Sequence, residues 1–338
     1  MRVVVTGGLG YIGSHTCVEL AREGSRLVIV DNFANSKLSV LPRIRELAPS
    51  ADIEFVRADI RDAAALDRVF AAGDIDAVVH FAGLKAVGES VSNPLLYYDD
   101  NVGGAIALLQ AMARHGAERI VFSSSATVYG VPEFLPYTEN HRLDAINPYG
   151  RSKLMIERII ADHAAARTSF RHATLRYFNP IGAHGSGRIG EDPRGVPNNL
   201  LPYLAQVAVG RLPGLRVFGG DYDTADGTGV RDYIHVVDLA RGHLAALRYL
   251  RSRERSITVN LGTGRGHSVL EVVKAFEQAT GRPVPYEIVA RRAGDLPAYY
   301  AETSLAASEL GWRAQFGIEE MCRDAWRWQS ENPTGYPD

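Results

Sequence analysis

The N-terminal residues of this chain leave few folds open to it. A short β-branched run, Arg2 to Thr6, passes directly into Gly7-Gly8-Leu9-Gly10-Tyr11-Ile12-Gly13 and then into an apolar-periodic stretch, Tyr11 to Ala21. In such a G-x-G-x-x-G loop, glycines permit a tight turn and a close approach of the backbone to pyrophosphate. A helix N-terminus adds free N–H donors and a partial positive charge. The pattern predicts a strand–loop–helix unit that binds a dinucleotide. The alternative is a glycine-rich turn without a ligand.

Strand-like and helical patterns alternate through the first half of the chain. Strand-like runs lie at residues 27–30, 53–56, 77–81 and 119–123, and helical patterns lie between them at residues 63–70 and 95–115. Short buried strands separated by helices are typical of a parallel sheet that is covered on both faces. We therefore expect an α/β fold with a doubly wound, Rossmann-type parallel sheet.

The second half has a different texture. Residues 179–199 are rich in Gly, Pro and Asn and predict a long irregular segment, which is usually functional inside a compact domain. Helical patterns follow at residues 200–209, 236–250, 269–280 and 318–330, with a strand-like run at 257–261. We expect a dinucleotide-binding domain over residues 1–180 and a smaller mixed α/β domain over residues 181–338, with later segments returning to the first.

Composition excludes several classes of protein. The 37 basic residues nearly balance the 39 acidic ones, whereas nucleic-acid binders usually carry a basic domain or face. Cys17 and Cys322 fit no metal or redox spacing, which favours a reducing compartment. No apolar run approaches the ~20 residues of a membrane helix, so a cytoplasmic protein is expected. The histidines form no H-E-x-x-H motif, and we read His15 and His80 as packing residues and predict no metal.

Acidic and apolar residues follow the ends of the predicted strands. Asp31 ends the second strand, 18 residues after Gly13. An acid at that point accepts from adenosine ribose hydroxyls and repels a 2′-phosphate, so NAD is favoured over NADP. Asp31 alone is equally compatible with a turn residue that caps Asn32-Phe33. Asp59-Ile60 and Phe81-Ala82-Gly83 follow the next two strands, where open α/β sheets bind ligands.

A tyrosine and a lysine are spaced for chemistry on one helix face. Tyr149 and Lys153 are four residues apart, and an ammonium near a phenol stabilises phenolate and lowers the tyrosine pKa. Ser125 ends another strand-like run and is expected to hydrogen-bond the same substrate hydroxyl. The chain has only four lysines, which makes a chance pairing less frequent. The alternative without catalysis is that Tyr149 and Lys153 lie at the exposed start of a helix and that Ser125 belongs to a polar strand end.

Together these residues resemble the extended branch of the short-chain dehydrogenase/reductase superfamily. The longer matches resemble the UDP-galactose 4-epimerase family and extend over essentially the whole chain. They lie at residues 1–8, 31–37, 80–90, 122–130, 176–180, 227–235, 294–299 and 335–338.

The resemblance implies a reaction and three catalytic roles. Tyr149 is the base, Lys153 holds the nicotinamide ribose and tunes the tyrosine, and Ser125 shares the proton transfer. NAD oxidises C4 of the hexose of UDP-glucose or UDP-galactose, the 4-keto intermediate rotates, and hydride returns to the opposite face. NAD stays bound between cycles.

The resemblance also implies a cofactor site built from the glycine loop and the strand ends. Its residues are Gly7, Gly10, Tyr11, Ile12, Gly13, Asp31, Asn32, Asn35, Ser36, Asp59, Ile60, Phe81, Ala82, Gly83, Lys85, Tyr177 and Phe178, with Tyr149 and Lys153. One position departs from the family, because Asp100 stands where some relatives carry asparagine. Such an acid either weakens a cofactor contact or is exposed.

For the UDP-sugar, the resemblance implies a pocket in the second half. Its residues are Asn179, Asn199, Leu200, Phe218, Arg231, Tyr233, Arg292, Asp295 and Tyr299, with Ser125. Arg231 and Arg292 suit a diphosphate because a guanidinium pairs with phosphate oxygens in bidentate fashion. Phe218 is expected to pack on uracil. A bulky Tyr299 is expected to limit the group at C2 of the sugar, so UDP-N-acetylglucosamine should be used poorly.

Three other functions compete with epimerisation. A nucleotide-sugar 4,6-dehydratase or decarboxylase needs further acids beside the serine, where this chain has Ala126-Thr127. A non-catalytic NAD-binding sensor has no need of the Tyr-x-x-x-Lys pair. A secondary-alcohol dehydrogenase would release NADH with its product. The resemblance also implies a homodimer. Two long helical patterns, at residues 95–112 and 149–166, are candidates to pack across its two-fold axis; the alternative is that both only cover their own sheet.

Overall fold

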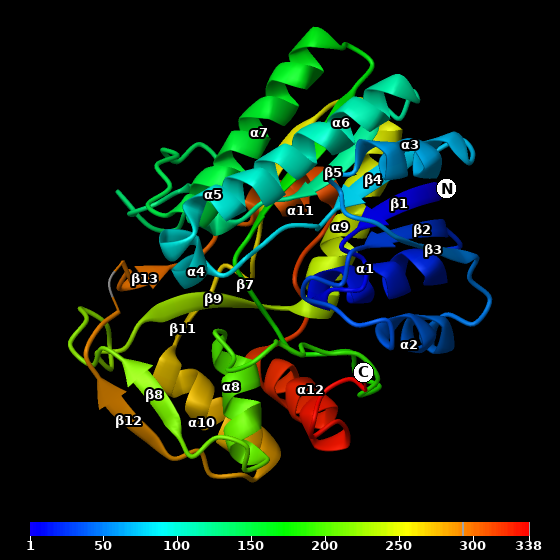
Figure 1. Ribbon diagram of the computed structural model, residues 1–338. Coiled ribbons are helices and arrows are strands. Elements are labelled where there is room, and N and C mark those ends of the chain that lie inside the picture. Colours follow the sequence, from blue (N-terminus) through cyan, green and yellow to red (C-terminus); the bar gives the residue numbers. More distant parts are fainter. Residues whose placement is uncertain (293, 338) are drawn as a thin grey trace.

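A seven-stranded parallel sheet lies at the centre of the larger of two regions of the molecule (Figure 1). The computed structural model describes residues 1–292 and 294–337; Asp338, the last residue of the C-terminal family match, lies outside them. The strands run in the order β10-β6-β5-β4-β1-β2-β3. Their bounds are β1 (Arg2–Thr6), β2 (Arg26–Asp31), β3 (Ile53–Arg57), β4 (Ala77–His80), β5 (Arg119–Ser123), β6 (Arg171–Tyr177) and β10 (Ile257–Leu261). The predicted α/β fold is confirmed.

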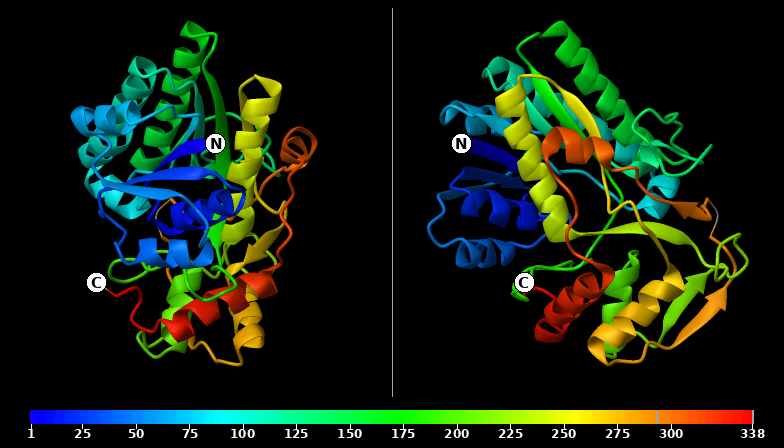
Figure 2. Two further views of the ribbon diagram at one scale, coloured as in Figure 1. Left: turned by 90° about the vertical axis from the view of Figure 1, so that its right-hand side faces the viewer. Right: turned by 180° about the vertical axis from the view of Figure 1, so that it is seen from behind.

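The sheet is buried on both faces because its strands are apolar on both sides. Val3 and Val5 of β1 point into one core and Val4 points into the other, as alternation along a strand requires. The first core is covered by α1 (Tyr11–Arg22), α2 (Val40–Leu47) and α9 (Val236–Arg253). The second is covered by α3 (Ala63–Ala71), α6 (Gly104–Arg114) and α7 (Pro148–Ala166), so helices flank the sheet on both sides (Figure 2).

The strand order reverses beside β1. β1 pairs with β2 on one side and with β4 on the other, so the connections from β1 and from β4 leave the sheet in opposite directions. In open α/β sheets, ligands bind at the carboxyl ends of the strands next to such a reversal. The glycine loop after β1 and the segment after β4 both lie at this edge.

Three elements from beyond residue 180 lie with the first half of the chain. β10 pairs with β6 at the edge of the large sheet, from Ile257 opposite Ala173 to Leu261 opposite Tyr177. α9 packs against α1, and α11 (Ser304–Leu310) packs against α9 and β10. The domain boundary near residue 180 stays a prediction.

The remaining residues form a smaller mixed α/β region. β9 (Val230–His235) pairs with β7 (Asn179–Ile181), β11 (Gly266–Ser268) and β13 (Ala298–Tyr299), and β8 (Leu215–Phe218) pairs with β12 (Tyr286–Val289). The core of this region lies under α8 (Leu200–Ala208), α10 (Val269–Thr280) and α12 (Ile318–Glu331), and Leu204, Phe276 and Met321 are buried in it. The strand β7 corrects the prediction of irregular structure from residue 179 onward. It forms because β9 supplies a distant partner, which local sequence patterns cannot reveal.

The helical pattern at residues 95–115 is interrupted by a wider turn. α4 (Val87–Ser92) and α5 (Pro94–Tyr97) lead into a π-helical segment, η1 (Tyr98–Gly103), before α6 begins. Such π-turns occur frequently at functional sites, and this one carries Asp100 and the buried Asn101. Within the described ranges, no helix has the length and apolar character needed to cross a bilayer.

Candidate active site

The glycine loop forms a backbone cradle at the start of α1. Gly7 has a φ of +68°, and a Cβ there would lie 2.7 Å from the Ala82 nitrogen. A Cβ on Gly13 would lie 2.2 Å from the Gly7 carbonyl oxygen. The Gly10 N–H donates to that same oxygen at 3.1 Å and closes the turn. No side chain caps the N-terminus of α1 and its first turn carries no acid, so the cradle fits a phosphate-bearing cofactor such as NAD.

Other residues of the loop are accounted for by packing. Tyr11 reaches into the second half, where its hydroxyl donates to the Gly182 carbonyl at 2.7 Å. Burial raises the pKa of this hydroxyl well above its ordinary value. Ile12 is partly buried against the core under α1.

Asp31 serves the turn that follows β2. Its carboxylate accepts from the Leu9 N–H at 3.0 Å, the Phe33 N–H at 2.9 Å and the Ser36 hydroxyl at 2.6 Å. Asp31 therefore ties the glycine loop to the loop after β2, as the turn-cap interpretation predicts. The same bonds hold a buried carboxylate beside the phosphate cradle, at the place where a ribose would be bound. Asn35 is exposed in this loop.

Asp59 and Asp100 share one arginine, Arg61, at the place predicted for the adenosine end of the cofactor. Asn32 donates to Asp59 at 3.0 Å, and the Arg61 guanidinium, 2.8 Å from Asp59, lowers the pKa of that carboxyl. Arg61 also lies 3.8 Å from Asp100. Asp100 is largely buried rather than exposed, and burial raises its pKa. Ile60 is buried against Gly104, where a Cβ would lie 2.4 Å from the isoleucine side chain.

The segment after β4 is fixed by Asn101, which the sequence did not single out as a site residue. Asn101 Oδ1 accepts from the Leu84 N–H at 2.7 Å, and its Nδ2 donates to the Leu84 carbonyl at 3.1 Å and to Ser152 Oγ at 3.0 Å. Gly83 has a φ of +147° and faces this amide. Phe81 and Ala82 donate their N–H groups to the Thr6 carbonyl, which draws the segment against the glycine loop.

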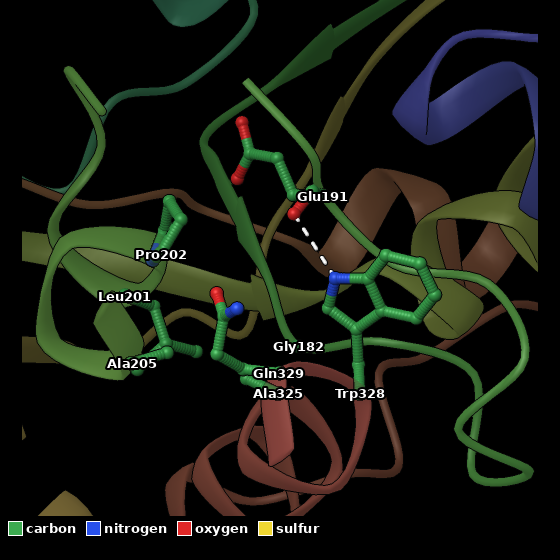
Figure 3. A pocket seen from close by; sticks show the side chains of 8 residues that line it. All are labelled: Gly182, Glu191, Leu201, Pro202, Ala205, Ala325, Trp328 and Gln329. Atoms are coloured by element: carbon green, nitrogen blue, oxygen red, sulfur yellow. Dashed lines mark hydrogen bonds between the residues drawn. The ribbon is translucent and has the colours of Figure 1, made fainter. Parts of the chain in front are cut away.

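Lys85 and Asn199 meet on one buried carboxylate. The Lys85 ammonium donates to Glu191 Oε1 at 3.0 Å, and Asn199 Nδ2 donates to the same oxygen at 2.7 Å. The Glu191 carbonyl accepts from the Trp328 indole at 3.1 Å (Figure 3). Glu191 is one of the residues around a small pocket between α8 and α12; the others are Gly182, Leu201, Pro202, Ala205, Ala325, Trp328 and Gln329. Leu200 is the first residue of α8. Sequence reasoning missed Glu191 because it lies in the irregular segment.

Tyr149, Lys153 and Ser125 come together at the carboxyl end of β5. α7 begins at Pro148, and the Asn147 side chain caps it by accepting from the Gly150 N–H at 2.8 Å. The Lys153 ammonium donates to the Ser123 carbonyl at 2.9 Å. Ser125 Oγ accepts two hydrogen bonds from Thr127, one from the backbone N–H at 3.2 Å and one from the threonine hydroxyl at 3.0 Å. The three predicted catalytic residues are all buried.

The electrostatics of this group differ from the sequence-based expectation. Burial raises the pKa of Tyr149 to about 12, while a hydrogen bond with Ser125 lowers it. Burial also lowers the pKa of Lys153 to about 8, and the charge of Glu157 opposes that fall. Burial therefore outweighs the lowering that the sequence predicts, and the pKa of Tyr149 lies above its ordinary value. The ammonium is directed at the Ser123 carbonyl and lies 6.0 Å from the centre of the tyrosine ring.

A second buried chain of hydrogen bonds supports Tyr177. Its hydroxyl is hydrogen-bonded to Ser123, and Ser123 Oγ lies 2.7 Å from His243 Nε2. His243 Nδ1 lies 2.9 Å from the Leu239 carbonyl and must donate to it, so Nε2 accepts from Ser123. The His243 ring also packs on Phe81 at 4.7 Å between centres. His243 thus backs two predicted cofactor residues, and no local motif pointed to it.

Residues predicted for the UDP-sugar gather on β9, β13 and the end of β8. Pairing of the strands puts Tyr299 opposite Arg231, and the guanidinium lies 4.5 Å from the ring centre. Arg292 lies 4.8 Å from the ring centre of Phe218 and donates to Asp295 at 2.9 Å. Asp295 is 4.0 Å from Arg231. Residues that are far apart in the sequence therefore form one cluster of two arginines, two aromatic rings and Asp295.

Three further residues that were predicted for the cofactor or the UDP-sugar lie around this cluster. Tyr233 is buried beside Arg231, and burial raises its pKa. Phe178 is buried and lies 6.1 Å from Tyr299 between ring centres. Asn179 Oδ1 is buried and has no hydrogen-bond partner among the described residues, which leaves an acceptor for a ligand donor.

The histidines at the site are explained by packing. His80 Nδ1 lies 2.7 Å from the Thr6 hydroxyl, and His15 Nδ1 lies 2.7 Å from the Tyr11 carbonyl. Burial lowers the pKa of each to about 3. In the part of the chain that the structure describes, no three His, Cys, Asp or Glu side chains are grouped to hold a metal ion.

Comparison with known proteins agrees with this geometry over the whole chain. Residues 3–262 match the model of the NAD dependent epimerase/dehydratase family. The chain is 57% identical to a UDP-glucose 4-epimerase of Bacillus subtilis over 336 residues, 99% of each chain.

Two solved structures are similar in fold as well as in sequence. A UDP-glucose 4-epimerase of Stenotrophomonas maltophila, with bound NAD and formylated UDP-arabinopyranose, has a TM-score of 0.96 at 55% identity and covers 98% of each chain. One of Bifidobacterium longum, in complex with NAD+ and UDP, has a TM-score of 0.95 at 50% identity, over 99% of this chain and 100% of the other.

Proposed function

The chain belongs to the NAD dependent epimerase/dehydratase family, and on this premise we propose that it interconverts UDP-galactose and UDP-glucose by inverting C4 of the sugar. The observation that carries the proposal is the buried group of Tyr149, Lys153 and Ser125 at the same sheet edge as the glycine cradle. The cluster around Arg231 and Arg292 adds a diphosphate and uridine pocket on the facing region.

The cradle and its neighbours are suited to hold NAD. The backbone of Gly7, Gly10 and Gly13 would take the pyrophosphate, Asp31 the adenosine ribose, and Tyr177 and Lys153 the nicotinamide end. NAD, when bound, supplies a hydride acceptor and donor for C4 and a positive charge beside Tyr149.

Tyr149 is the residue we assign to proton transfer. As phenolate, it takes the proton from the C4 hydroxyl while that carbon is oxidised, and it returns the proton when the 4-keto sugar is reduced. Burial opposes the phenolate, since it raises the pKa of Tyr149 to about 12. The Lys153 ammonium and the Ser125 hydroxyl stabilise the anion and hold the sugar hydroxyl.

Inversion requires that the nucleotide stays fixed while the sugar turns. Arg231 and Arg292 are positioned to hold the diphosphate, and Phe218 offers a flat face for uracil. The 4-keto sugar then rotates about its link to the diphosphate and presents its other face. Tyr299, which packs on Arg231, limits the room at C2 during that turn.

We also propose a homodimer in the cytoplasm. Exposed apolar side chains lie on the two helical stretches that the sequence assigned to a two-fold contact, namely Leu95, Leu96, Ile106 and Met155, and Val91 of α4 is exposed as well. The helices α4, α5 and α6 each pack against α7, and exposed apolar side chains on neighbouring helices favour an interaction site. Sedimentation equilibrium at micromolar concentration should give twice the chain mass. Cys17 and Cys322 are buried and unpaired, which suits a reducing compartment.

One incubation tests the activity against its competitors. Purified protein is mixed with UDP-galactose without added cofactor, and the products are followed by chromatography, mass and absorbance of reduced nicotinamide. Formation of UDP-glucose at unchanged mass is the expected result. Loss of the mass of water would favour a dehydratase and free NADH a dehydrogenase. An unchanged substrate would favour a sensor or a decarboxylase, since UDP-galactose has no carboxylate to lose.

A further inference from the structure

A third ionisable residue lies on the catalytic face of α7. Tyr149, Lys153 and Glu157 follow one another at intervals of four residues, so one turn of helix separates each from the next. Glu157 is only 8% exposed. Nothing in the local sequence distinguishes it from the other acids of the chain.

The Glu157 carboxylate contacts the two strands that carry the rest of the catalytic group. The Ser124 hydroxyl, next to Ser125 after β5, donates to Oε1. Arg176, next to Tyr177 on β6, donates from Nη2 to Oε2 at 2.7 Å and from Nε to Oε1 at 3.1 Å. One carboxylate therefore joins α7, β5 and β6 directly behind the reaction centre.

The partner of Glu157 is itself held in place. Arg176 is 7% exposed, and its Nη1 donates to the Tyr129 hydroxyl at 3.2 Å and to the Glu139 carbonyl at 3.0 Å. Tyr129 donates onward to Asn260 of β10 at 2.6 Å. Neither charge of the pair is free to turn toward solvent.

A buried ion pair is a costly way to fill space. Two buried charges lose their hydration, and apolar residues of the same volume often serve stability as well or better. A carboxylate at this position therefore calls for a role that an apolar side chain cannot supply. The adjacent Lys153 is also buried, and burial works against its charge.

The surroundings of Lys153 leave Glu157 as its source of negative charge. Tyr149 and Glu157 face it from α7, and His80 faces it from β4 as a neutral ring, since burial lowers the pKa of His80 to about 3. Phe122 and the Ser123 carbonyl of β5 complete the contacts. Tyr177 lies beyond Ser123 on β6, and Arg176 lies behind Glu157. Glu157 lies one helical turn from Lys153 on the same face of α7, and its negative charge opposes the fall of the Lys153 pKa.

We propose that Glu157 is a positioning residue of the reaction, which keeps Lys153 charged beside Tyr149 and holds Ser124 and Arg176 in register with α7. The inference rests on the proposed function, because it assigns Glu157 to the same proton transfer. It predicts that Glu157 sets the upper pH limit of turnover, where Lys153 loses its proton.

The test is the pH profile of Glu157→Gln in the protein purified with its NAD. The amide keeps the size of the side chain and removes the charge, so the alkaline limb of kcat should move down by about one pH unit, a tenfold effect. KM for UDP-galactose should stay within about twofold, because the residues proposed to bind the nucleotide lie elsewhere. In parallel, the ultraviolet absorbance of tyrosinate is titrated against Tyr149→Phe as baseline, and Tyr149 should ionise at higher pH in the amide variant.

Three matched variants complete the design. Ser124→Ala removes one hydrogen bond and keeps the charge, so its alkaline limb should stay in place. Glu46→Gln makes the same chemical change at a surface pair with Arg188 and should leave the profile unaltered. Glu157→Asp retracts the carboxylate by one methylene, so the limb should move in the same direction as in Glu157→Gln but less far.

The outcomes separate this inference from the proposed function. A limb and a tyrosinate titration that match the parent in Glu157→Gln would overturn the role of Glu157. If the amide variant does not fold, an unmoved limb in Glu157→Asp overturns it instead. Failure of the parent protein to convert UDP-galactose would instead count against the proposed function itself.

Discussion

The two halves of the proposed site are built by different means. In the cofactor half the backbone shapes the cradle: glycines without room for a Cβ, and segments held by N–H groups and buried Asp31 and Asn101 side chains. In the nucleotide-sugar half, side chains form the pocket, and the Arg292 side chain is 53% exposed. A backbone cradle accepts one shape, whereas a pocket of side chains changes specificity by single substitutions. Substitutions in the cofactor half should therefore abolish NAD binding, whereas substitutions in the nucleotide-sugar half should change which sugar is preferred.

The largest effect is expected where the two halves meet, at Tyr149. Tyr149→Phe removes the group assigned to proton transfer, so kcat should fall by about 10²- to 10⁴-fold. The NAD content of the purified variant should match the parent, because the cradle is untouched. Turnover within tenfold of the parent would place the base elsewhere.

The cradle should tolerate no Cβ. In Gly13→Ala the new carbon would lie 2.2 Å from the Gly7 carbonyl oxygen, so the loop must move and NAD should be lost on purification. Gly88→Ala is the matched control, since Gly88 has open space around it. Bound NAD is measured after acid release. Equal NAD content in both variants would contradict a backbone cradle.

The sugar pocket should change specificity without losing function. Tyr299→Cys removes a ring that packs on Arg231 and Phe178, so it should raise kcat/KM for UDP-N-acetylglucosamine by about tenfold or more. Turnover of UDP-galactose should persist with a higher KM. If the acetylated sugar is still refused, another residue limits the space at C2.

The smallest effect is expected at the carboxylate shared by Lys85 and Asn199. Glu191→Gln keeps one acceptor oxygen for Lys85 and Asn199 but removes the negative charge, which weakens the hold on the half-exposed Lys85, so NAD release should be roughly threefold faster. Release is followed by trapping free NAD with an excess of a dehydrogenase. An unchanged release rate would mean that Lys85 is held in place without the charge of Glu191.

The elements of the cofactor half were easier to predict from the sequence than the buried ion pairs and the tyrosine pKa around them. The glycine loop, the strand ends and the Tyr149–Lys153 spacing are local patterns, and local patterns map directly onto a strand, a turn or a helix face. Glu157 with Arg176, and Glu191 with Lys85, are pairs far apart in sequence that only the folded chain brings together. β7 was missed for the same reason, since its partner β9 lies far along the chain. The direction of the Tyr149 pKa depends on how deeply the ring is buried, which spacing does not encode.

The position of β10 has a consequence for the synthesis of this protein. The sheet that carries the cofactor cradle is completed by residues 257–261, which pair with β6. A ribosome must therefore make about half of residues 181–338 before the edge of that sheet is covered. Until then β6 presents an open strand, the kind of edge that invites pairing with other chains. A chain that terminates before residue 257 consequently leaves this sheet incomplete.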